Sequence, residues 1–184
     1  ANPTVVAEQV NSERATFRVV RVAKDLTYPW SIAFLPDNSA LISERPGALL
    51  RLNLRTDKLR SVTGTPRVVA IGQGGFLDIE PHPQFSQNRL IYMSYTIGDI
   101  GYYATRIARG RLTNNSLKDI EVLFTMNQPS AGGLHFGSRL AFDTDGMLYA
   151  TFGERGERHR AQDPADHAGT IIRLLDDGSV PADN

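Results

Sequence analysis

The chain has 184 residues, with 20 acidic and 20 basic side chains and no cysteine. This length suits one domain with a sizeable core, and the lack of cysteine excludes disulfides and thiolate chemistry. No basic stripe typical of a nucleic-acid surface is present. No apolar run approaches the roughly 20 residues that cross a bilayer as a helix. We therefore expect neither a nucleic-acid partner nor a membrane span.

The chain opens with a polar segment, residues 1–16, that has no signal-peptide pattern. Its start at Ala1 suits a mature chain trimmed after a small residue, and it equally suits an artificial boundary. The sequence of this segment therefore does not decide the cellular compartment of the protein.

Three later segments share one pattern: a short apolar strand, a polar turn, a second apolar strand, a polar loop and a strand ending in Arg-Leu. They span residues 32–52, 77–112 and 140–174. The arginines of their endings are 60 and 62 residues apart, at Arg51, Arg111 and Arg173. The strands are rich in aliphatic and aromatic residues, and turn-forming residues separate them.

Repeated antiparallel units of this kind predict an all-β fold of the β-propeller type, with about four strands in each blade. A plain β-sandwich is the alternative, and the repeated Arg-Leu endings favour the propeller. Three blades do not close a ring, since propellers have roughly four to eight. The chain also ends in a loop-like sequence, GSVPADN. We therefore expect residues 1–184 to form a single, partial propeller domain of a longer polypeptide.

One histidine, His135, lies in the glycine-rich stretch SAGGLHFGSRL. The sequence Asp143-Thr144-Asp145-Gly146 predicts a tight hairpin turn just after it. With Asp143 opposite Gly146, counting outward places His135 opposite Glu154, close enough for the carboxylate to hold one imidazole nitrogen. A bulge at Gly146, or an irregularity at Gly137 or Gly153, would shift this pairing by one residue. The alternative is an ordinary surface or core histidine beside a solvated acid.

From Leu26 onward the sequence resembles the soluble sugar dehydrogenases that depend on pyrroloquinoline quinone (PQQ), the glucose/sorbosone and aldose sugar dehydrogenase family. The segments that carry the resemblance are LTYPWSIAFLPDNSALISERPGALLRLN, GQGGFLDIEPHPQF, GGLHFGSRLAFDTDGMLYATFGERGER and AGTIIRLLDDGSVPADN. The resemblance implies a six-bladed β-propeller with PQQ flat over the channel, of which this chain supplies about the first half.

The resemblance also implies the roles of two residues in catalysis. His135 is expected to be the general base that takes the proton of the sugar's anomeric hydroxyl while hydride passes to PQQ. Glu154 is expected to support His135, at a position where the family has aspartate. Glu44 and Arg45 repeat the Glu-Arg pair formed by Glu154 and Arg155, which indicates a structural habit and weighs against a special role for Glu154.

Three further residues are binding candidates. Gln73, beside three glycines, is expected to contact PQQ through its amide, and the alternative is a plain loop glutamine. Arg139 is a candidate for contacting the charged cofactor, with a surface ion pair as the alternative. His159 falls where the family places a sugar-contacting side chain. Asp78 is expected to cap a turn.

No metal-ligand spacing is visible in the chain. The family uses calcium to bind PQQ, and the resemblance places the calcium ligands and most PQQ contacts outside this sequence. Because PQQ carries three carboxylates that need cationic partners, we expect the 184-residue chain alone to be inactive.

The expected function is therefore oxidation of an aldose sugar to its lactone by a PQQ- and calcium-dependent enzyme that is periplasmic or secreted. The alternatives are a non-catalytic propeller of the same lineage that binds a protein partner, since the fold does not decide function, and a calcium-dependent hydrolase propeller such as a lactonase. The sugar, the electron acceptor and the oligomeric state do not follow from the sequence.

Overall fold

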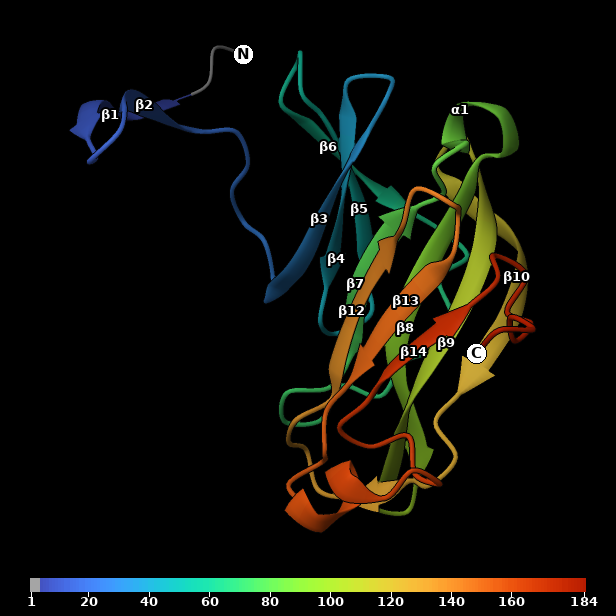
Figure 1. Cartoon of the computed structure of the whole chain (residues 1–184). Helices are drawn as coiled ribbons and strands as arrows, with labels where there is room; N and C mark the ends of the chain where they lie inside the picture. The colour runs from blue at the N-terminus through green and yellow to red at the C-terminus, as the bar shows by residue number, and fades with distance from the viewer. Residues whose placement is uncertain (1–3) are drawn as a thin grey trace.

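The computed structural model describes residues 4–184, which fold almost entirely as β-strands (Figure 1). An N-terminal hairpin pairs β1 (Thr4–Asn11) with β2 (Thr16–Arg21) and stands apart from the other sheets. The polar segment 1–16 thus contains β1 and the first residue of β2, while residues 1–3 lie outside the described part.

The remaining strands form three antiparallel sheets, which are the propeller blades A, B and C. Blade A contains β3 (Pro29–Leu35), β4 (Ser39–Glu44), β5 (Leu49–Asn53) and β6 (Lys58–Val62). Blade B contains β7 (Phe76–Pro81), β8 (Leu90–Asp99), β9 (Tyr102–Thr113) and β10 (Ser116–Thr125), with the short β11 (Ser130–Ala131) beside β9. Blade C contains β12 (Gly137–Phe142), β13 (Leu148–Phe152) and β14 (Ile171–Leu174).

Two short helices complete the described chain, α1 (Phe85–Asn88) and the 3₁₀ helix η1 (Arg158–Gln162). Neither they nor any other part of residues 4–184 forms a helix of the length and apolarity that a bilayer crossing requires.

The predicted all-β class and the three repeated units are confirmed. The Arg-Leu pairs lie on the third strand of each blade, β5, β9 and β14, and the three leucines are buried with exposures of 0, 5 and 3% at Leu52, Leu112 and Leu174. The predicted units end with these third strands. They omit β6 and β10, whose side chains are mostly polar or exposed and so lack a strand-like apolar pattern.

The first strands of the three blades, β3, β7 and β12, are neighbours, since β7 contacts both of the others. This is the arrangement of inner strands around a propeller axis. The loops that enter β7 and β12 meet at one end of the molecule, in the lower part of Figure 1, where Gly72 and Gly133 lie against each other.

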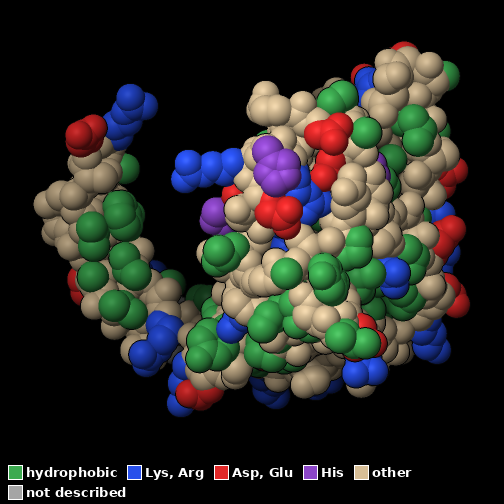
Figure 2. Space-filling model, turned by 90° about the horizontal axis from the view of Figure 1, so that it is seen from below, with side chains coloured by type: hydrophobic (Ala, Val, Ile, Leu, Met, Phe, Trp, Pro, Cys, Tyr) green, Lys and Arg blue, Asp and Glu red, His purple; other side chains and the backbone are tan. Residues whose placement is uncertain are grey.

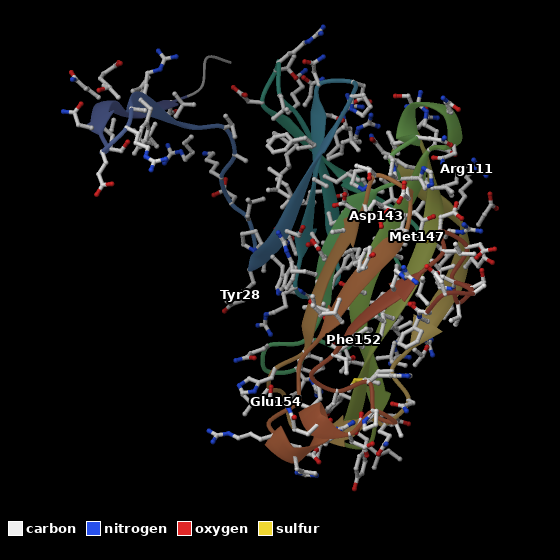
Figure 3. All side chains as sticks on the ribbon, in the orientation of Figure 1. Tyr28, Arg111, Asp143, Met147, Phe152 and Glu154 are labelled. Carbon is white, nitrogen blue, oxygen red and sulfur yellow. The ribbon has the colours of Figure 1, made fainter. Side chains whose placement is uncertain are left out.

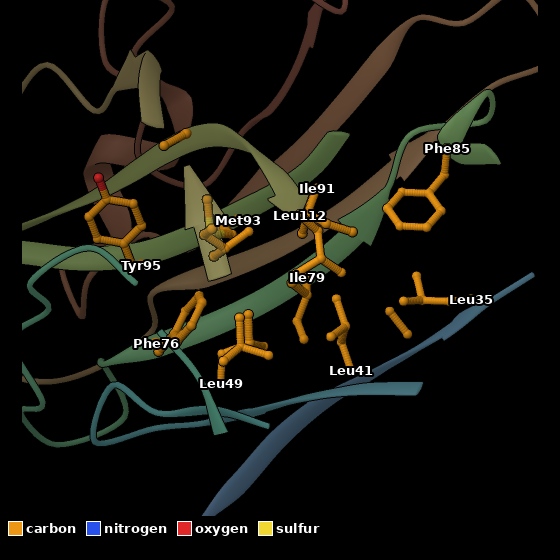
Figure 4. Packing of buried hydrophobic residues seen from close by; sticks show 14 residues of the cluster. Leu35, Leu41, Leu49, Phe76, Ile79, Phe85, Ile91, Met93, Tyr95 and Leu112 are labelled. Carbon is orange, nitrogen blue, oxygen red and sulfur yellow. The ribbon is translucent and has the colours of Figure 1, made fainter. Parts of the chain in front are cut away.

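The core consists of two layers, one on each face of blade B. The layer between blades A and B includes Leu41, Leu49, Phe76 and Met93 (Figure 4). The layer between blades B and C includes residues of β8, β9, β12 and β13. Because strand residues alternate between faces, Tyr92 of β8 packs against blade C while its neighbour Met93 packs against blade A. Both faces of β8 are covered, which explains its nearly continuous apolar sequence.

Blades A and C each leave apolar side chains exposed on the strand faces that do not pack against blade B. Ile32 and Phe34 of β3 are 51 and 67% exposed, and Ile171 of β14 is 70% exposed. In blade C, β14 is an edge strand, since this sheet has three strands where blade A has four.

Candidate functional site

The hairpin β12–β13 carries the two candidate catalytic residues at its open end. Figure 3 shows Asp143 and Met147 at its closed end and Phe152 and Glu154 at the other. The turn differs from the prediction: Asp143 lies opposite Met147, not Gly146, and their backbones form a hydrogen bond of 3.1 Å. The three-residue loop places Gly146 at a φ of 82°, as in a type I turn followed by a G1 bulge.

A second irregularity cancels this one-residue shift. Gly137 pairs with Phe152 and Leu140 pairs with Ala150, so Ser138 and Arg139 together lie opposite Thr151. The bulge is held by hydrogen bonds, because the Arg139 N–H donates to the Thr151 hydroxyl at 2.9 Å. The two bulges together restore the alignment that an uninterrupted hairpin would have, and His135 again lies opposite Glu154.

The side chains of His135 and Glu154 are in contact, with the imidazole Nδ1 facing the carboxylate Oε1. Their side chains are 48 and 25% exposed, so the pair is open to solvent on one side. The carboxylate also accepts the Gly156 N–H at 3.2 Å. The hydrogen bond from His135 holds the pKa of Glu154 below its ordinary value. A charged Glu154 keeps the proton on Nδ1, which leaves Nε2 as the free nitrogen.

The backbone around His135 is tightly constrained. His135 has a φ of 48°, in the left-handed region that ordinary residues rarely adopt. Gly153 lies directly against it, since a Cβ on Gly153 would be 1.9 Å from the His135 carbonyl oxygen. The missing side chain of Gly153 thus allows the two strands to approach closely at the place where His135 is presented.

Gln73 lies beside His135, although it precedes the first strand of another blade. Its Oε1 accepts the His135 backbone N–H at 2.8 Å, and its own N–H donates to the Gly133 carbonyl at 2.7 Å. The loops touch through Gly72 and Gly133, where a Cβ on Gly72 would lie 2.3 Å from the Gly133 oxygen. The structure therefore brings together Gln73, His135 and Glu154.

Arg139 belongs to a different group of side chains. Its guanidinium donates to Asp78 Oδ1 at 3.0 Å and lies over the Trp30 ring, 5.5 Å from its centre. Asp78 is 3% exposed and also accepts the Ser31 hydroxyl at 2.5 Å and the Leu140 N–H at 2.8 Å. The prediction that Asp78 caps a turn is therefore wrong: it joins the inner strands of all three blades. One side of Arg139 stays free, because its side chain is 65% exposed.

His159 lies on η1 with an exposed side chain. It lines a hollow of about 330 Å³, together with Tyr102, Ser130 and Glu157. Glu157 follows Glu154 by one turn, with its N–H donating to the Glu154 carbonyl at 2.9 Å. This hollow therefore begins next to the His135–Glu154 pair, at the end of the molecule that Figure 2 shows, where histidine and acidic side chains gather.

Two residues at this end were not singled out by the sequence as site residues. Arg155 is 3% exposed and donates to carbonyls of the loop that carries His135. Arg45 donates to carbonyls of the loop that carries Gln73. The repeated Glu-Arg pattern was the available signal, but the pattern alone does not tell which groups the guanidinium contacts.

The residues present suit a planar, oxygen-rich group such as PQQ. The Gln73 side-chain oxygen is occupied by His135, so its NH₂ group remains as a donor. The imidazole is half-exposed, and a Cβ on Gly132 in the same loop would meet nothing within 4 Å. A flat ligand could therefore approach the backbone here. Within residues 4–184, no three or more His, Asp or Glu side chains cluster as a metal site.

Comparison with known proteins gives several matches. The family described as Glucose / Sorbosone dehydrogenase matches residues 26–184. Aldose sugar dehydrogenase of Escherichia coli is 39% identical over 92% of this chain and 47% of its own length. A crystal structure of a glucose dehydrogenase superposes with a TM-score of 0.83 at 38% identity, covering 86% of this chain and 47% of that one.

The PQQ-bound form of aldose sugar dehydrogenase from Streptomyces coelicolor superposes with a TM-score of 0.78 at 28% identity, covering 89% of this chain and 49% of that one. The chain thus spans about half the length of the relatives it matches. Blades A, B and C accordingly correspond to about half of a six-bladed propeller.

Proposed function

The chain belongs to the glucose/sorbosone dehydrogenase family, and from this premise we propose that it carries the base-containing part of a PQQ-dependent aldose dehydrogenase. The observation that supports this most is the contact between His135 Nδ1 and Glu154, joined to Gln73 through the His135 backbone. A non-catalytic binding propeller has no need for a half-exposed imidazole oriented in this way.

In the proposed reaction His135 is the general base. The proton of the anomeric hydroxyl passes to Nε2 of His135, because Nδ1 is engaged by Glu154. PQQ, when held beside Gln73 and Arg139, would supply the oxidant that accepts the hydride lost from C1 of the aldose, so that the sugar would leave as its lactone. The imidazolium that forms is stabilised by the charged Glu154, whose lowered pKa keeps it ionised.

The three other candidate residues bind cofactor or sugar in this proposal. The NH₂ group of Gln73 donates to a PQQ oxygen, and Arg139 offers its exposed side to the negative charge of the cofactor. The hollow beside His159 receives part of the sugar, since its lining offers an imidazole, a carboxylate and an aromatic ring at Tyr102.

Calcium is part of the proposal, and its ligands are expected outside this sequence. We also propose that the protein is periplasmic or secreted, which is the location that the family resemblance implies. Fractionation of cells that express the full-length protein tests the location: finding it confined to the cytoplasm contradicts the proposal.

The decisive experiment measures dye reduction by the full-length protein with PQQ, calcium and glucose or another aldose. We expect turnover that requires PQQ and is lost in His135→Asn. The 184-residue chain is expected to give no turnover under the same conditions. A full-length protein that binds no PQQ and oxidises no aldose would instead support the non-catalytic alternative, in which the propeller binds a protein partner.

A further inference from the structure

The pairs Glu44-Arg45 and Glu154-Arg155 occupy equivalent places in blades A and C. Each arginine directly follows the end of the second strand or its extension, and its backbone N–H donates to a residue with positive φ. In blade A, Arg45 donates to the Tyr28 carbonyl at 3.0 Å, and in blade C, Arg155 donates to the His135 carbonyl at 3.4 Å. Tyr28 and His135 have φ values of 50 and 48°. The same local structure thus occurs twice, and in blade C it presents the candidate base.

The side chain of Arg155 holds the loop that enters β12. Its Nη1 donates to the Leu134 carbonyl at 2.8 Å and its Nη2 to the Gly132 carbonyl at 3.1 Å, so the two carbonyls flank Gly133. The guanidinium carbon lies 3.3 Å from the centre of the Phe136 ring. Leu134 and Phe136 are the immediate neighbours of His135. Arg155 therefore contacts the chain on both sides of the candidate base.

Arg155 is unusual in being buried without a carboxylate partner. The ion pairs found within residues 4–184 do not include it, and its side-chain hydrogen bonds go to two carbonyls and to the Ser130 hydroxyl. Burial, followed by repulsion from Arg160, lowers its pKa to about 10. Burial of a charged guanidinium is unfavourable because the charge loses its contact with water. The carbonyls that the forked donor group of Arg155 holds in place explain why an arginine is buried here.

Arg45 makes the corresponding contacts with the loop of Gln73. Its Nη1 donates to the carbonyls of Gly72 and Gly74, which flank Gln73, the latter at 3.4 Å. Its own carbonyl accepts the Phe76 N–H at 2.9 Å, at the start of β7. Since Gln73 and His135 are hydrogen-bonded to each other, the two arginines hold the two loops as one unit.

We propose that Arg155 is a positioning residue for His135, and that Arg45 does the same for Gln73, a proposal that rests on the function proposed above. Neither arginine touches the reacting atoms. Arg155 holds the His135 imidazole where its Nε2 can accept the proton of the anomeric hydroxyl. In the same position, its Nδ1 stays hydrogen-bonded to Glu154. Its forked geometry matters, because one guanidinium reaches two carbonyls that a lysine ammonium does not span in the same way.

The test compares Arg155→Met, Arg155→Lys and Arg109→Met in the full-length protein. Arg109 is the matched control, since it is also largely buried and donates to a loop carbonyl, that of Asp176, at 2.9 Å, but lies on β9 away from the site. We expect Arg155→Met to lower kcat by about 100-fold, the size of effect that a misplaced catalytic group produces. KM should change much less, Arg155→Lys should be intermediate, and Arg109→Met should keep kcat while lowering Tm.

A second readout does not depend on turnover. The ring ¹⁵N resonances of His135 in the protein without PQQ report whether Nδ1 carries a proton held by Glu154. We expect this signature to be lost or averaged in Arg155→Met and kept in Arg109→Met. If Arg155→Met keeps both wild-type kcat and the His135 signature, the positioning role is wrong. If the wild type oxidises no aldose but Arg155→Met still alters the His135 signature, the proposed function fails and the positioning role stands.

Discussion

The backbone N–H of His135 donates a hydrogen bond of 2.8 Å to the side-chain oxygen of Gln73. This bond fixes which end of the Gln73 amide faces the loop and which end faces outward. The candidate base and the candidate cofactor contact are therefore placed by the same interaction, although they come from loops that enter different blades.

The first prediction tests the roles of the side-chain oxygen and the NH₂ group of Gln73 separately. Gln73→Glu keeps an oxygen that can accept the His135 N–H, but it replaces the outward donor with negative charge. We expect the PQQ affinity of the full-length protein to fall, because PQQ itself carries carboxylates, while the apoprotein keeps its Tm. Gln73→Leu should lower both. Equal PQQ affinity in Gln73→Glu and wild type would show that the amide does not contact the cofactor.

The second prediction concerns the His135–Glu154 pair. His135→Asn should lower kcat by about 10²- to 10⁴-fold, the usual contribution of a general base, and Glu154→Gln should lower it by a smaller factor. Because the pKa of Glu154 is lowered by the His135 hydrogen bond, the carboxylate contributes stability that is present above its unfolded pKa and is lost as the pH falls through the lowered pKa. A pH profile of the unfolding free energy for Glu154→Gln should lack that acid-side loss. A profile identical to that of the wild type would contradict the pairing role.

The third prediction uses the close approach at Gly153. Gly153→Ala places a Cβ against the His135 carbonyl, so we expect a loss of about 1–3 kcal/mol in unfolding free energy together with a reduced kcat. Gly146→Ala is the control at the closed end of the hairpin, since its Cβ meets nothing within 4 Å and its φ of 82° costs only backbone strain, about 1–2 kcal/mol. Urea titration and steady-state kinetics on both variants provide the comparison. The idea fails if Gly146→Ala loses as much kcat as Gly153→Ala.

The fourth prediction addresses Asp78 as the link between the blades. Asp78→Asn should destabilise the protein by about 2 kcal/mol, because charged hydrogen bonds to Ser31, Arg139 and Leu140 are weakened in a buried place. Arg139→Ala should cost no more than about 1 kcal/mol, since the arginine is largely exposed. Chemical denaturation measures the loss of unfolding free energy in both variants. A larger loss in Arg139→Ala than in Asp78→Asn would refute the prediction.

The fifth prediction is a pH dependence of stability from Glu80. Burial, with repulsion from Asp78, raises the pKa of Glu80 from 4.5 to about 7. Between these two values the folded protein retains a proton that the unfolded chain has released, so the free energy of unfolding falls as the pH rises through this window. Glu80→Gln should therefore gain stability over wild type at pH 8 and little at pH 5. An equal effect at both pH values would show that Glu80 is ionised in the fold.

Much of the fold could be predicted because the same pattern of apolar side chains recurs in each blade. The buried leucines after Arg51, Arg111 and Arg173 mark the third strand of each blade. The fourth strands β6 and β10 could not be predicted in the same way, because they lie at the outer edges of their sheets and carry few buried residues.

The site was predictable in part for a different reason. The facing positions of His135 and Glu154 followed from the hairpin, although the assumed pairing of Asp143 with Gly146 was wrong and a second bulge compensated for it. The destinations of the Arg155 and Arg139 side chains could not be predicted, because long side chains reach partners that are distant in sequence. The role of Asp78 was mispredicted for the same reason, since the partners of its side chain belong to the two other blades.

The compensating bulges of β12–β13 limit which hairpins can replace this one without moving His135 away from Glu154. Shortening the three-residue loop before Met147 to two residues shifts the registry by one, so the imidazole of His135 would lose the carboxylate opposite it. A replacement hairpin keeps His135 opposite Glu154 only if it contains both one-residue shifts or neither of them. The length of the loop at the closed end of the hairpin thus determines which residue lies opposite His135 at the open end.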